Sequence, residues 1–443
     1  MLEFDDIQYI LVTRVPALTG RYEFLSFQQP AQGRAWLEAI REKVPSAKAV
    51  ASTVHQERRW VSLAFTWNGL RALGVDETSL ATFPEEFRQG TAARWQAIGD
   101  TGTNHPDNWV GNLAGPQLHA IAILFARDAD DRARSVHEHR ALLARTAGVE
   151  VLSSLDLEAI PPFDHVREHF GYRDRLTTPE IEGTGIVPTP GTGAPIKAGE
   201  FILGYPDEEG PPSNLPQPEI LSRNGSYMAY RRLQQHVAAF RDFLREQGGP
   251  TAEEQELLAA KLMGRWRSGA PLVLAPEKDD PRLADDPQRN NNFNYATMDP
   301  KGYAVPLGSH IRRMNPRDTT VGSLRRRKII RRGATYGAAL PEGAAEDGVD
   351  RGIAAFVICA SLIRQFEFIQ NVWANDPNFH ELGNEHDPMI GAQNGTLDFT
   401  IPRRPIRKKI NGLPAFTTVK GGAYFFLPGI KALQHLAALG GQL

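Results

Sequence analysis

The sequence predicts a fold of mixed strands and helices in two halves, because one order of elements occurs in both parts of the chain. Residues 119–129, HAIAILFARDA, form an apolar run of strand length, and residues 128–146 follow with the spaced apolar side chains of a helix. Residues 351–361, RGIAAFVICAS, and 362–373, LIRQFEFIQNVW, repeat this strand-then-helix order. The run DIQYILVTRV at residues 6–15 also has the length and composition of a strand. We therefore expect similar βα units in both halves.

A segment rich in proline and glycine separates the halves. Residues 180–224 include IEGTGIVPTPGTGAPIKAGEF and GYPDEEGPPSNLPQP, which no single helix or strand can accommodate. We place the domain boundary inside this segment. The prediction is a first domain of residues 1–200 and a second domain of residues 201–443.

Two elements of the second half can be predicted from their patterns. Residues 228–249 carry apolar side chains at helical spacing and end in two glycines, which predicts an amphipathic helix. Residues 275–309 are polar and rich in turn formers, and they predict a long loop that leads directly to His310. Functional side chains are common at the ends of such loops.

Composition excludes several classes of protein. The chain has 443 residues and a formal net charge of −2, and its apolar and charged fractions are those of a soluble globular protein. Cys359 is the only cysteine, which excludes an internal disulfide framework and a thiolate metal cluster and favours a reducing, cytoplasmic environment. The first residues are acidic, and no apolar run approaches the roughly 20 residues needed to cross a bilayer. We expect neither export nor membrane insertion.

His310 precedes a strongly basic segment, which has two interpretations. From Arg312 to Arg332 the chain carries nine Lys or Arg against one acidic residue. One interpretation is a patch for phosphate or nucleic acid, and the other is an iron ligand whose cofactor brings its own carboxylates. Because the net charge of the chain is close to zero, the basic run is a local feature, which argues against nucleic acid as a partner.

Two weaker motifs have functional and structural interpretations. His165 and His169, with Glu168 between them, match the H-x-x-E-H pattern of a zinc site, but a solvated helix face explains them as well. Residues 183–193, GTGIVPTPGTG, are rich in glycine, but their prolines and the lack of a following helix disfavour a phosphate-binding loop.

The blocks around His310 resemble one known family. PLGSHIRRMNPRD resembles the proximal-histidine segment of the dye-decolourising peroxidases, and IIRRGATYG resembles their distal-arginine segment. VSLAFTWNGLRALGV, FPEEFRQG, GEFILGYPDEEG, LMGRWRSGAPL and FEFIQNVWAND resemble further blocks of the longer bacterial and fungal members, in the same order. The resemblance therefore covers nearly the whole chain.

This resemblance implies a fold and a cofactor. The family has two ferredoxin-like α+β domains with antiparallel sheets and peripheral helices, and it holds haem b mainly in the C-terminal domain. His310 is then the iron ligand, Asp174 the catalytic base and Arg331 the distal cation, which would also contact the cofactor. Arg332 is adjacent, and a shift of one residue in the comparison would exchange it with Arg331.

One family motif is altered in this chain. The family signature is GxxDG, and the equivalent segment HFGYRDRLTTPEIEG keeps Gly171 and Asp174 but has Arg175 in place of the last glycine. If that position requires a positive φ, an arginine there costs on the order of 1 kcal/mol.

The resemblance also implies how the haem is held. Asp350, just ahead of the strand predicted at residues 351–361, is expected to accept a hydrogen bond from His310 and to orient it. Arg312, with Arg317 and Arg313 behind it, is expected to pair the haem propionates, because guanidinium groups suit carboxylates.

Other residues near these motifs have more ordinary expected places. Phe356 is expected to contact the cofactor, while Tyr336 and Trp373 are expected in the core, where one of the three aromatic residues could relay an electron to the surface. Cys359 is expected to be a small apolar core residue. The basic run 325–328 is expected to be a solvated helix face or a dimer contact.

The implied function is peroxidase catalysis. Such an enzyme uses H₂O₂ to oxidise dyes, phenols or other one-electron donors through a ferryl intermediate, without nucleic acid or membrane as partners and with a homo-oligomer possible. Because an aspartate base stays ionised in acid, dye oxidation should be best at roughly pH 3 to 5. The alternative is a haem storage or sensing protein with incidental peroxidase activity, which would have no use for a distal acid and cation.

Overall fold

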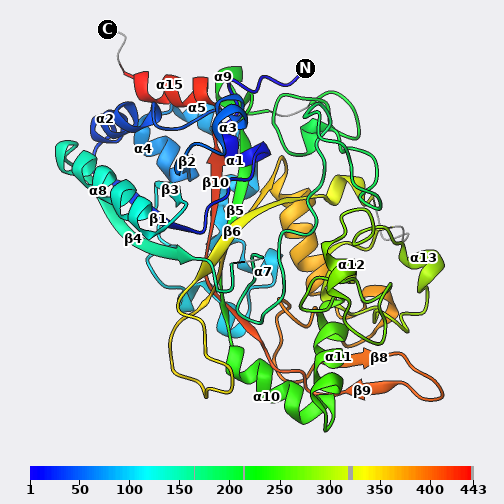
Figure 1. Cartoon of the computed structure of the whole chain (residues 1–443). Helices are drawn as coiled ribbons and strands as arrows, with labels where there is room; N and C mark the ends of the chain where they lie inside the picture. The colour runs from blue at the N-terminus through cyan, green and yellow to red at the C-terminus, as the bar shows by residue number, and fades with distance from the viewer. Residues whose placement is uncertain (164, 213–214, 318–322, 441–443) are drawn as a thin grey trace.

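The two halves of the chain contribute equally to one antiparallel sheet. The computed structural model describes residues 1–163, 165–212, 215–317 and 323–440, and its eight-stranded sheet has the order β4-β1-β3-β2-β10-β5-β7-β6 (Figure 1). The strands of the first half are β1 (Thr19–Phe27), β2 (Arg59–Phe65), β3 (Ala120–Ala126) and β4 (Val149–Glu158). Those of the second half are β5 (Ser226–Gln235), β6 (Ile330–Tyr336), β7 (Gly352–Cys359) and β10 (Thr417–Leu427). Numbered within its own half, each set of four has the order 4-1-3-2, so the prediction of two ferredoxin-like units with antiparallel sheets is confirmed.

The first half is compact, and its two long helices cover the outer face of its strands. The two long helices are α2 (Pro30–Arg41) and α8 (Ala129–Arg145), and the shorter ones are α1 (Tyr9–Val12), α3 (Ala47–Thr53), α4 (Trp67–Leu73), α5 (Glu77–Ala81), α6 (Glu85–Ala93) and α7 (Trp95–Ile98). α8 begins at Asp128, whose side chain accepts a hydrogen bond from the backbone of Asp131. Every residue of β3 is buried, because helices cover one face of this strand and the second half of the chain covers the other.

The second half carries long insertions between its strands. Between β5 and β6 lie α10 (Val237–Gly248), α11 (Ala252–Met263), α12 (Pro281–Asp285), α13 (Tyr295–Met298) and α14 (His310–Met314). After β7 come two π-helical turns, Leu362–Glu367 and Ile369–Ala374, and the hairpin of β8 (Phe399–Ile401) and β9 (Lys408–Ile410), which projects at the lower right of Figure 1. The chain also includes α9 (Glu219–Ser222) and ends in α15 (Ile430–Ala438). These insertions supply a large part of the walls of the site described below.

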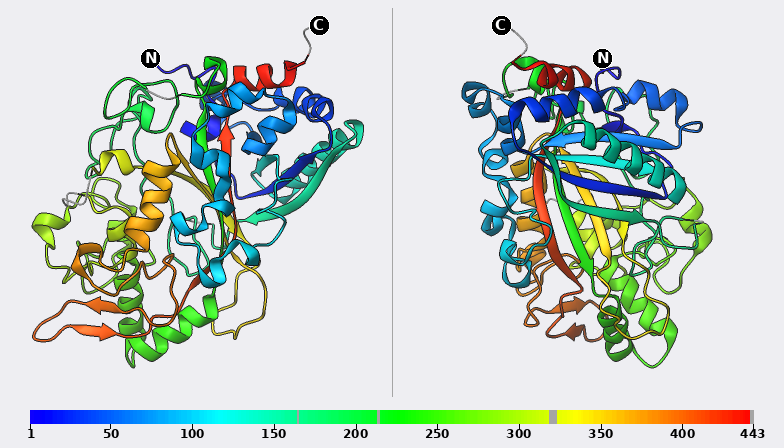
Figure 2. Two further views of the ribbon diagram at one scale, coloured as in Figure 1. Left: turned by 180° about the vertical axis from the view of Figure 1, so that it is seen from behind. Right: turned by 90° about the vertical axis from the view of Figure 1, so that its left-hand side faces the viewer.

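The two four-stranded units join edge to edge and also pack face to face. β2 and β10 share a single residue pair, Phe65 with Phe426. The right-hand view of Figure 2 shows the blue and cyan strands of the first half crossing the green, yellow and red strands of the second. Between them the ring of Tyr22 lies 5.1 Å from that of Phe356 and 6.0 Å from that of Tyr230. The sheet therefore curls round a shared aromatic core as an α+β barrel.

The structure confirms some predicted elements and corrects others. The strands at 119–129 and 351–361 and the helix at 128–146 are present as β3, β7 and α8. The expected strand at 6–15 is wrong, because its centre is the one-turn helix α1. The expected helix at 228–249 is wrong in its first part, because residues 228–235 belong to β5 and α10 begins at Val237. The run YILV of α1 is short and mostly buried, and periodicity cannot distinguish a buried strand from a buried helix in such a run. In β5 the buried side chains lie on both faces of the strand, so the sequence lacks the alternation of a half-buried strand. The domain boundary at residue 200 stays a prediction.

A buried ion pair ties the halves together. Asp100 follows α7 in the first half, and its two carboxylate oxygens accept hydrogen bonds of 2.6 and 2.5 Å from the guanidinium of Arg231 in β5. Both side chains are almost completely buried. A paired arrangement of this kind satisfies both charges where no solvent reaches them.

Replacing Asp100 by alanine should lower the free energy of unfolding by about 3–5 kcal/mol, because Arg231 would stay buried without a counter-charge. Urea unfolding measures the loss. Glu77→Ala, which removes the partner of the exposed Arg71, is the matched control and should have a much smaller effect. Equal losses for the two variants would contradict the role given to the buried pair.

Candidate active site

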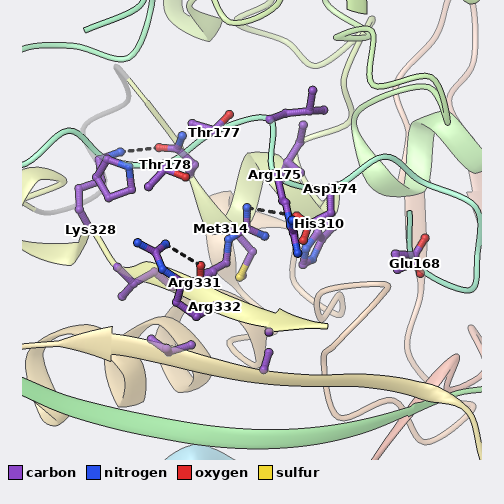
Figure 3. Close-up of a pocket in the computed structure, with 18 of the residues that line it drawn as sticks. Glu168, Asp174, Arg175, Thr177, Thr178, His310, Met314, Lys328, Arg331 and Arg332 are labelled. Atoms are coloured by element: carbon purple, nitrogen blue, oxygen red, sulfur yellow. Dashed lines mark hydrogen bonds and ion pairs between the residues drawn. The ribbon is translucent and has the colours of Figure 1, made fainter. Parts of the chain in front are cut away.

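One large cavity lies where the second half meets the loop that follows β4. Its volume is about 1010 Å³, which is at the upper end of the range for small-molecule and cofactor sites. The walls come from β6 and β7, from α14 and the π-helical segment after β7, and from loop residues 166–179. Figure 3 shows His310, Asp174 and Arg331 among the side chains that line it. Three residues far apart in the sequence therefore share one space.

His310 is the first residue of α14, and a buried carboxylate holds its ring. Its Nδ1–H donates to the two carboxylate oxygens of Asp387 at 3.0 and 2.9 Å. Asp387 is fully buried, and its Oδ1 also accepts hydrogen bonds from the backbone N–H groups of Met389 and Ile390, each at 2.9 Å. Burial raises the pKa of Asp387, but the interaction with His310 and these backbone hydrogen bonds lower it below its ordinary value. Since Nδ1 is engaged, Nε2 is the nitrogen that can bind a metal from the cavity.

Asp350 is not the partner of His310, and that prediction is wrong. Asp350 accepts hydrogen bonds from the hydroxyl of Tyr336 at 3.0 Å and from Arg232 at 2.6 Å. It lies just ahead of β7, as expected. Asp387 follows His310 by 77 residues along the chain. No local spacing in the sequence connects the two residues. The aspartate before proline in NEHDPMIG was only a weak signal of a structural or functional role for Asp387.

Asp174 and Arg331 lie beside one another at the cavity. The Nη2 of Arg331 is 3.7 Å from Oδ1 of Asp174. The side chain of Arg331 is 52% accessible and that of Asp174 is 49% accessible, because both face the cavity. Burial raises the pKa of Asp174, but the charges of Arg331 and Arg14 and a hydrogen bond from the backbone of Arg175 outweigh this effect and lower it below the ordinary value. The carboxylate is therefore ionised except in strong acid.

Arg332 is engaged differently from its neighbour. It donates to the backbone carbonyls of Ile10 at 2.7 Å and Leu11 at 3.2 Å, and it is only 8% exposed. Successive side chains of a strand point to opposite faces, so β6 can present only one of its two arginines beside Asp174. That residue is Arg331, as the sequence comparison predicted.

The altered motif has the backbone conformation that glycine favours. Arg175 has φ of 65° and Gly171 has φ of 94°, so both positions are left-handed. An arginine in this region costs on the order of 1 kcal/mol relative to an unstrained backbone. The position of Arg175 does require a positive φ. The turn that presents Asp174 therefore keeps its conformation in spite of the substitution.

Arg312 does not reach the cavity, and its expected role with propionates is wrong. It is 1% exposed, donates to the carboxylate of Asp299 at 3.2 Å and to the carbonyl of Val305 at 2.8 Å, and stacks over Tyr295. Residues two apart on a helix do not share a face, so an arginine two positions after His310 in α14 points away from the cavity that His310 lines. The spacing of two residues between His310 and Arg312 was therefore already an argument against this role.

Arg317 does line the cavity, as expected. Its guanidinium lies 3.7 Å from the centre of the Phe293 ring and donates to the carbonyls of Gly191 at 2.9 Å and Asn291 at 3.1 Å. It therefore brings a positive charge to the cavity on a rigid, stacked side chain.

The basic run 325–328 is not a solvated α-helix face, and the expected dimer contact stays a prediction. Arg325 to Arg327 form one 3₁₀ turn, and Arg325 donates to Glu208 at 2.8 and 2.7 Å. Arg325, Arg327 and Lys328 line the cavity. Burial lowers the pKa of Lys328 to about 8, and the nearby Arg317 and Arg325 add to this effect. Sequence reasoning missed this second group of cations beside the site.

The remaining expected residues occupy the core or its edge. Phe356 is completely buried in β7 and contributes to the cavity wall, while Tyr336 and Trp373 are each 2% exposed. Cys359 is buried, and burial raises the pKa of its thiol to about 12, which confirms a core residue and not a thiolate ligand. No helix among the described residues combines the length and apolarity needed to cross a bilayer.

The two weaker motifs do not form sites of their own. The segment HVREH is not helical, and His169 donates from Nε2 to the carbonyl of Tyr336 at 2.9 Å. The Nε2 of His165 lies 3.3 Å from Asp285. Within the described ranges, no three His, Cys, Asp or Glu side chains come together as a metal site, so the zinc interpretation is wrong. Residues 191–194, which include the end of the glycine-rich segment, contribute to the wall of the large cavity.

The cavity suits a flat, largely apolar cofactor with an anionic edge. Ile353, Val357, Ile369 and Met389 supply apolar contacts, and His310 supplies a nitrogen ligand fixed by a carboxylate. Arg317 and Lys328 are cations where anionic groups of the cofactor could be paired. These are the features that haem requires, so the residues present fit the group that the resemblance implies.

Comparisons with known proteins agree with this geometry. Residues 6–155 match a family model described as the DyP dimeric alpha+beta barrel domain. Peroxidase 2 of Mycetinis scorodonius is 31% identical over 98% of this chain and 87% of its own, and a dye-decolorizing peroxidase of Mycena epipterygia is 30% identical over 99% and 87%. The crystal structure of a fungal DyP-type peroxidase from Auricularia auricula-judae has a TM-score of 0.87 at 28% identity and covers 99% of this chain and 100% of that one. The chain therefore belongs to the dye-decolourising peroxidase family.

Proposed function

We propose that this chain is a haem peroxidase that uses hydrogen peroxide to oxidise dyes, phenols and other one-electron donors. The observation that carries the proposal is the shared cavity, which has a carboxylate-held histidine and an ionised acid–arginine pair in its walls. Among similar structures is a dye-decolorizing peroxidase in complex with 2,6-dimethoxyphenol, which supports phenols as reductants here. A haem storage or sensing protein is disfavoured, because the distal pair would have no role in it.

His310 would bind the haem iron through Nε2, and Asp387 would make that nitrogen more electron-rich. The strong acceptor at Nδ1 draws the ring proton toward the carboxylate, which gives the imidazole partial imidazolate character. Bound haem supplies the redox chemistry, since its iron can take two oxidising equivalents from peroxide and return them to donors one electron at a time. An electron-rich ligand favours the oxidised states of the iron.

Asp174 and Arg331 would act on hydrogen peroxide itself. The carboxylate of Asp174 accepts the proton of one peroxide oxygen and returns it to the other, which leaves as water. The guanidinium of Arg331 stabilises the negative charge that develops on the peroxide oxygens as their bond breaks. The 3.7 Å separation places the two groups near enough to act on one small molecule.

The cofactor is proposed to be haem b, held without covalent links. Thioether attachment of a haem needs cysteines, and the single cysteine of this chain, Cys359, is buried in the core. Arg317 and Lys328 are the proposed partners of the haem propionates, in place of Arg312. Cytoplasmic location and homo-oligomer formation are also proposals; the single buried cysteine supports the first of them.

Asp387→Asn should raise the reduction potential of the haem iron, because a neutral amide withdraws less of the proton at Nδ1 than a carboxylate does. Spectroelectrochemical titration of the purified holoenzyme measures the potential. Asp350→Asn is the matched control and should leave it unchanged. A shift in the control and none in Asp387→Asn would reverse the assignment of the partner.

Arg331→Leu should slow the reaction with peroxide by about 10²- to 10³-fold, as expected for loss of a group that stabilises developing charge. Stopped-flow absorbance at the Soret band measures this rate while haem content is monitored separately. Arg331→Lys keeps the charge and should recover part of the rate. An Arg331→Leu enzyme as fast as wild type would remove Arg331 from the mechanism.

The fall in the rate of the peroxide reaction at low pH, the acid limb of the rate–pH profile, should reflect protonation of Asp174. Its pKa is lowered below the ordinary value of 3.8, so the rate should hold in mild acid and fall only as pH drops through that lowered pKa. Arg331→Leu removes a charge that lowers this pKa, so the acid limb should move to higher pH. Asp174→Asn should cost about 10²- to 10⁴-fold and abolish the limb. Rate–pH profiles of the three proteins test this, and an unaltered limb in Asp174→Asn would assign proton transfer to another group.

A further inference from the structure

A second, smaller cavity lies next to the large one, on the far side of Arg14 and Arg175. Its volume is about 280 Å³, and these two arginines line both cavities, as Arg332 also does. Arg332 completes a set of three guanidinium groups in its wall. The rest of the wall is mostly apolar and comes from Leu11, Val12, Ile181, Ile186 and Ile330, with the hydroxyls of Thr178 and Thr184 among them.

The three guanidinium groups have no counter-charge at ion-pair distance among the described residues. Arg14 donates only to the hydroxyl of Thr178 at 3.4 Å and to the carbonyl of Arg331 at 3.3 Å. Arg332 donates only to backbone carbonyls. Within the described part of the chain, no hydrogen bond or ion pair engages the side chain of Arg175. Asp174 is at ion-pair distance from Arg331, and its negative charge also raises the pKa of Arg14 and Arg175 against the effect of burial.

Such a cluster is costly unless an anion joins it. Burial lowers the pKa of Arg14 to about 10 and that of Arg332 to about 9, and neighbouring arginines add to both effects. Glu180 is the one acid in the described wall of the second cavity, and burial raises its pKa. Buried cations without partners are unfavourable, so the site favours a negatively charged occupant.

The backbone of Arg175 supplies an independent argument. Its φ of 65° lies where glycine is favoured, and the equivalent family position is glycine in the resemblance described above. An arginine held there carries strain that the turn itself does not need. Strained residues of this kind are concentrated at functional sites.

We propose that the second cavity binds a small organic carboxylate, held by Arg14 and Arg175 and separate from the peroxide site. The carboxylate oxygens would accept hydrogen bonds from the two guanidinium groups and from the hydroxyl of Thr178. The apolar part of the ligand would lie against Leu11 and Ile330. The volume admits a single-ring or short-chain acid but no dye, since most ligand sites exceed roughly 300 Å³.

Isothermal titration of the holoenzyme with benzoate, in the absence of peroxide, tests the proposal. Benzoate should bind, while benzamide, which has the same shape without the charge, should not. Arg175→Gly and Arg14→Gln should each weaken benzoate binding by about tenfold or more, the effect of losing one hydrogen bond to a charged group. Arg71→Gln, which removes an equal charge from the exposed surface, should leave the affinity unchanged.

Three results would overturn the proposal. They are no binding at millimolar benzoate, equal binding of benzamide, or full affinity in both Arg175→Gly and Arg14→Gln, which would place the anion in the large cavity beside Arg331. If Arg14→Gln fails to fold, Arg175→Gly decides alone, because glycine adopts the required φ without strain. Since the titration contains no peroxide, its outcome is independent of whether the chain is a peroxidase.

Discussion

The hydrogen bonds between His310 and Asp387 are the interaction on which the rest of the site depends. A buried carboxylate that accepts from an imidazole and from two backbone N–H groups has one low-energy position, and the ring it holds has one as well. α14 is only five residues long, so the helix alone could not fix this geometry. The long insertions of the second half are what bring Asp387 and α14 together. The insertions therefore add a candidate cofactor site to the α+β sheet.

Charge is distributed unequally around the large cavity. Arginines and a lysine line its walls in two groups, one near Arg317 and Lys328 and the other near Arg331 and Arg14, while Asp174 stays ionised between cations. The first group suits a cofactor with carboxylates at its edge. The second group lowers the pKa of Asp174, the proposed base. The excess of positive charge along the cavity walls therefore suits cofactor binding at one place and acid–base chemistry at another.

Sequence reasoning could identify the residues whose roles depend on their type within a local motif. His310, Asp174 and Arg331 were found in this way, and all three line the cavity. It failed where a role depends on direction or on distant contacts. Arg312 was expected near the cofactor because it is close to His310 in sequence, but helical geometry turns it into the core. Asp387 comes from another loop of the chain.

The fold shows the same division between local and distant information. β3, β7 and α8 follow from continuous apolar runs and from the spaced apolar side chains of a helix, which are local properties. The strand β5 was mistaken for the start of a helix because its residues are buried on both faces by elements that the pattern does not contain. The order of strands within each half, by contrast, could be predicted from the family resemblance, because a known fold includes the contacts between residues that are distant in the sequence.

The position of α15 has a consequence for folding. Leu433 and Leu436 of this helix pack in one core with Trp36 and Leu37 of α2, so a helix of the second half completes the hydrophobic core of the first. The first half alone cannot bury this face of α2. Domains generally fold as units, but here the folding of the first half is coupled to that of the second.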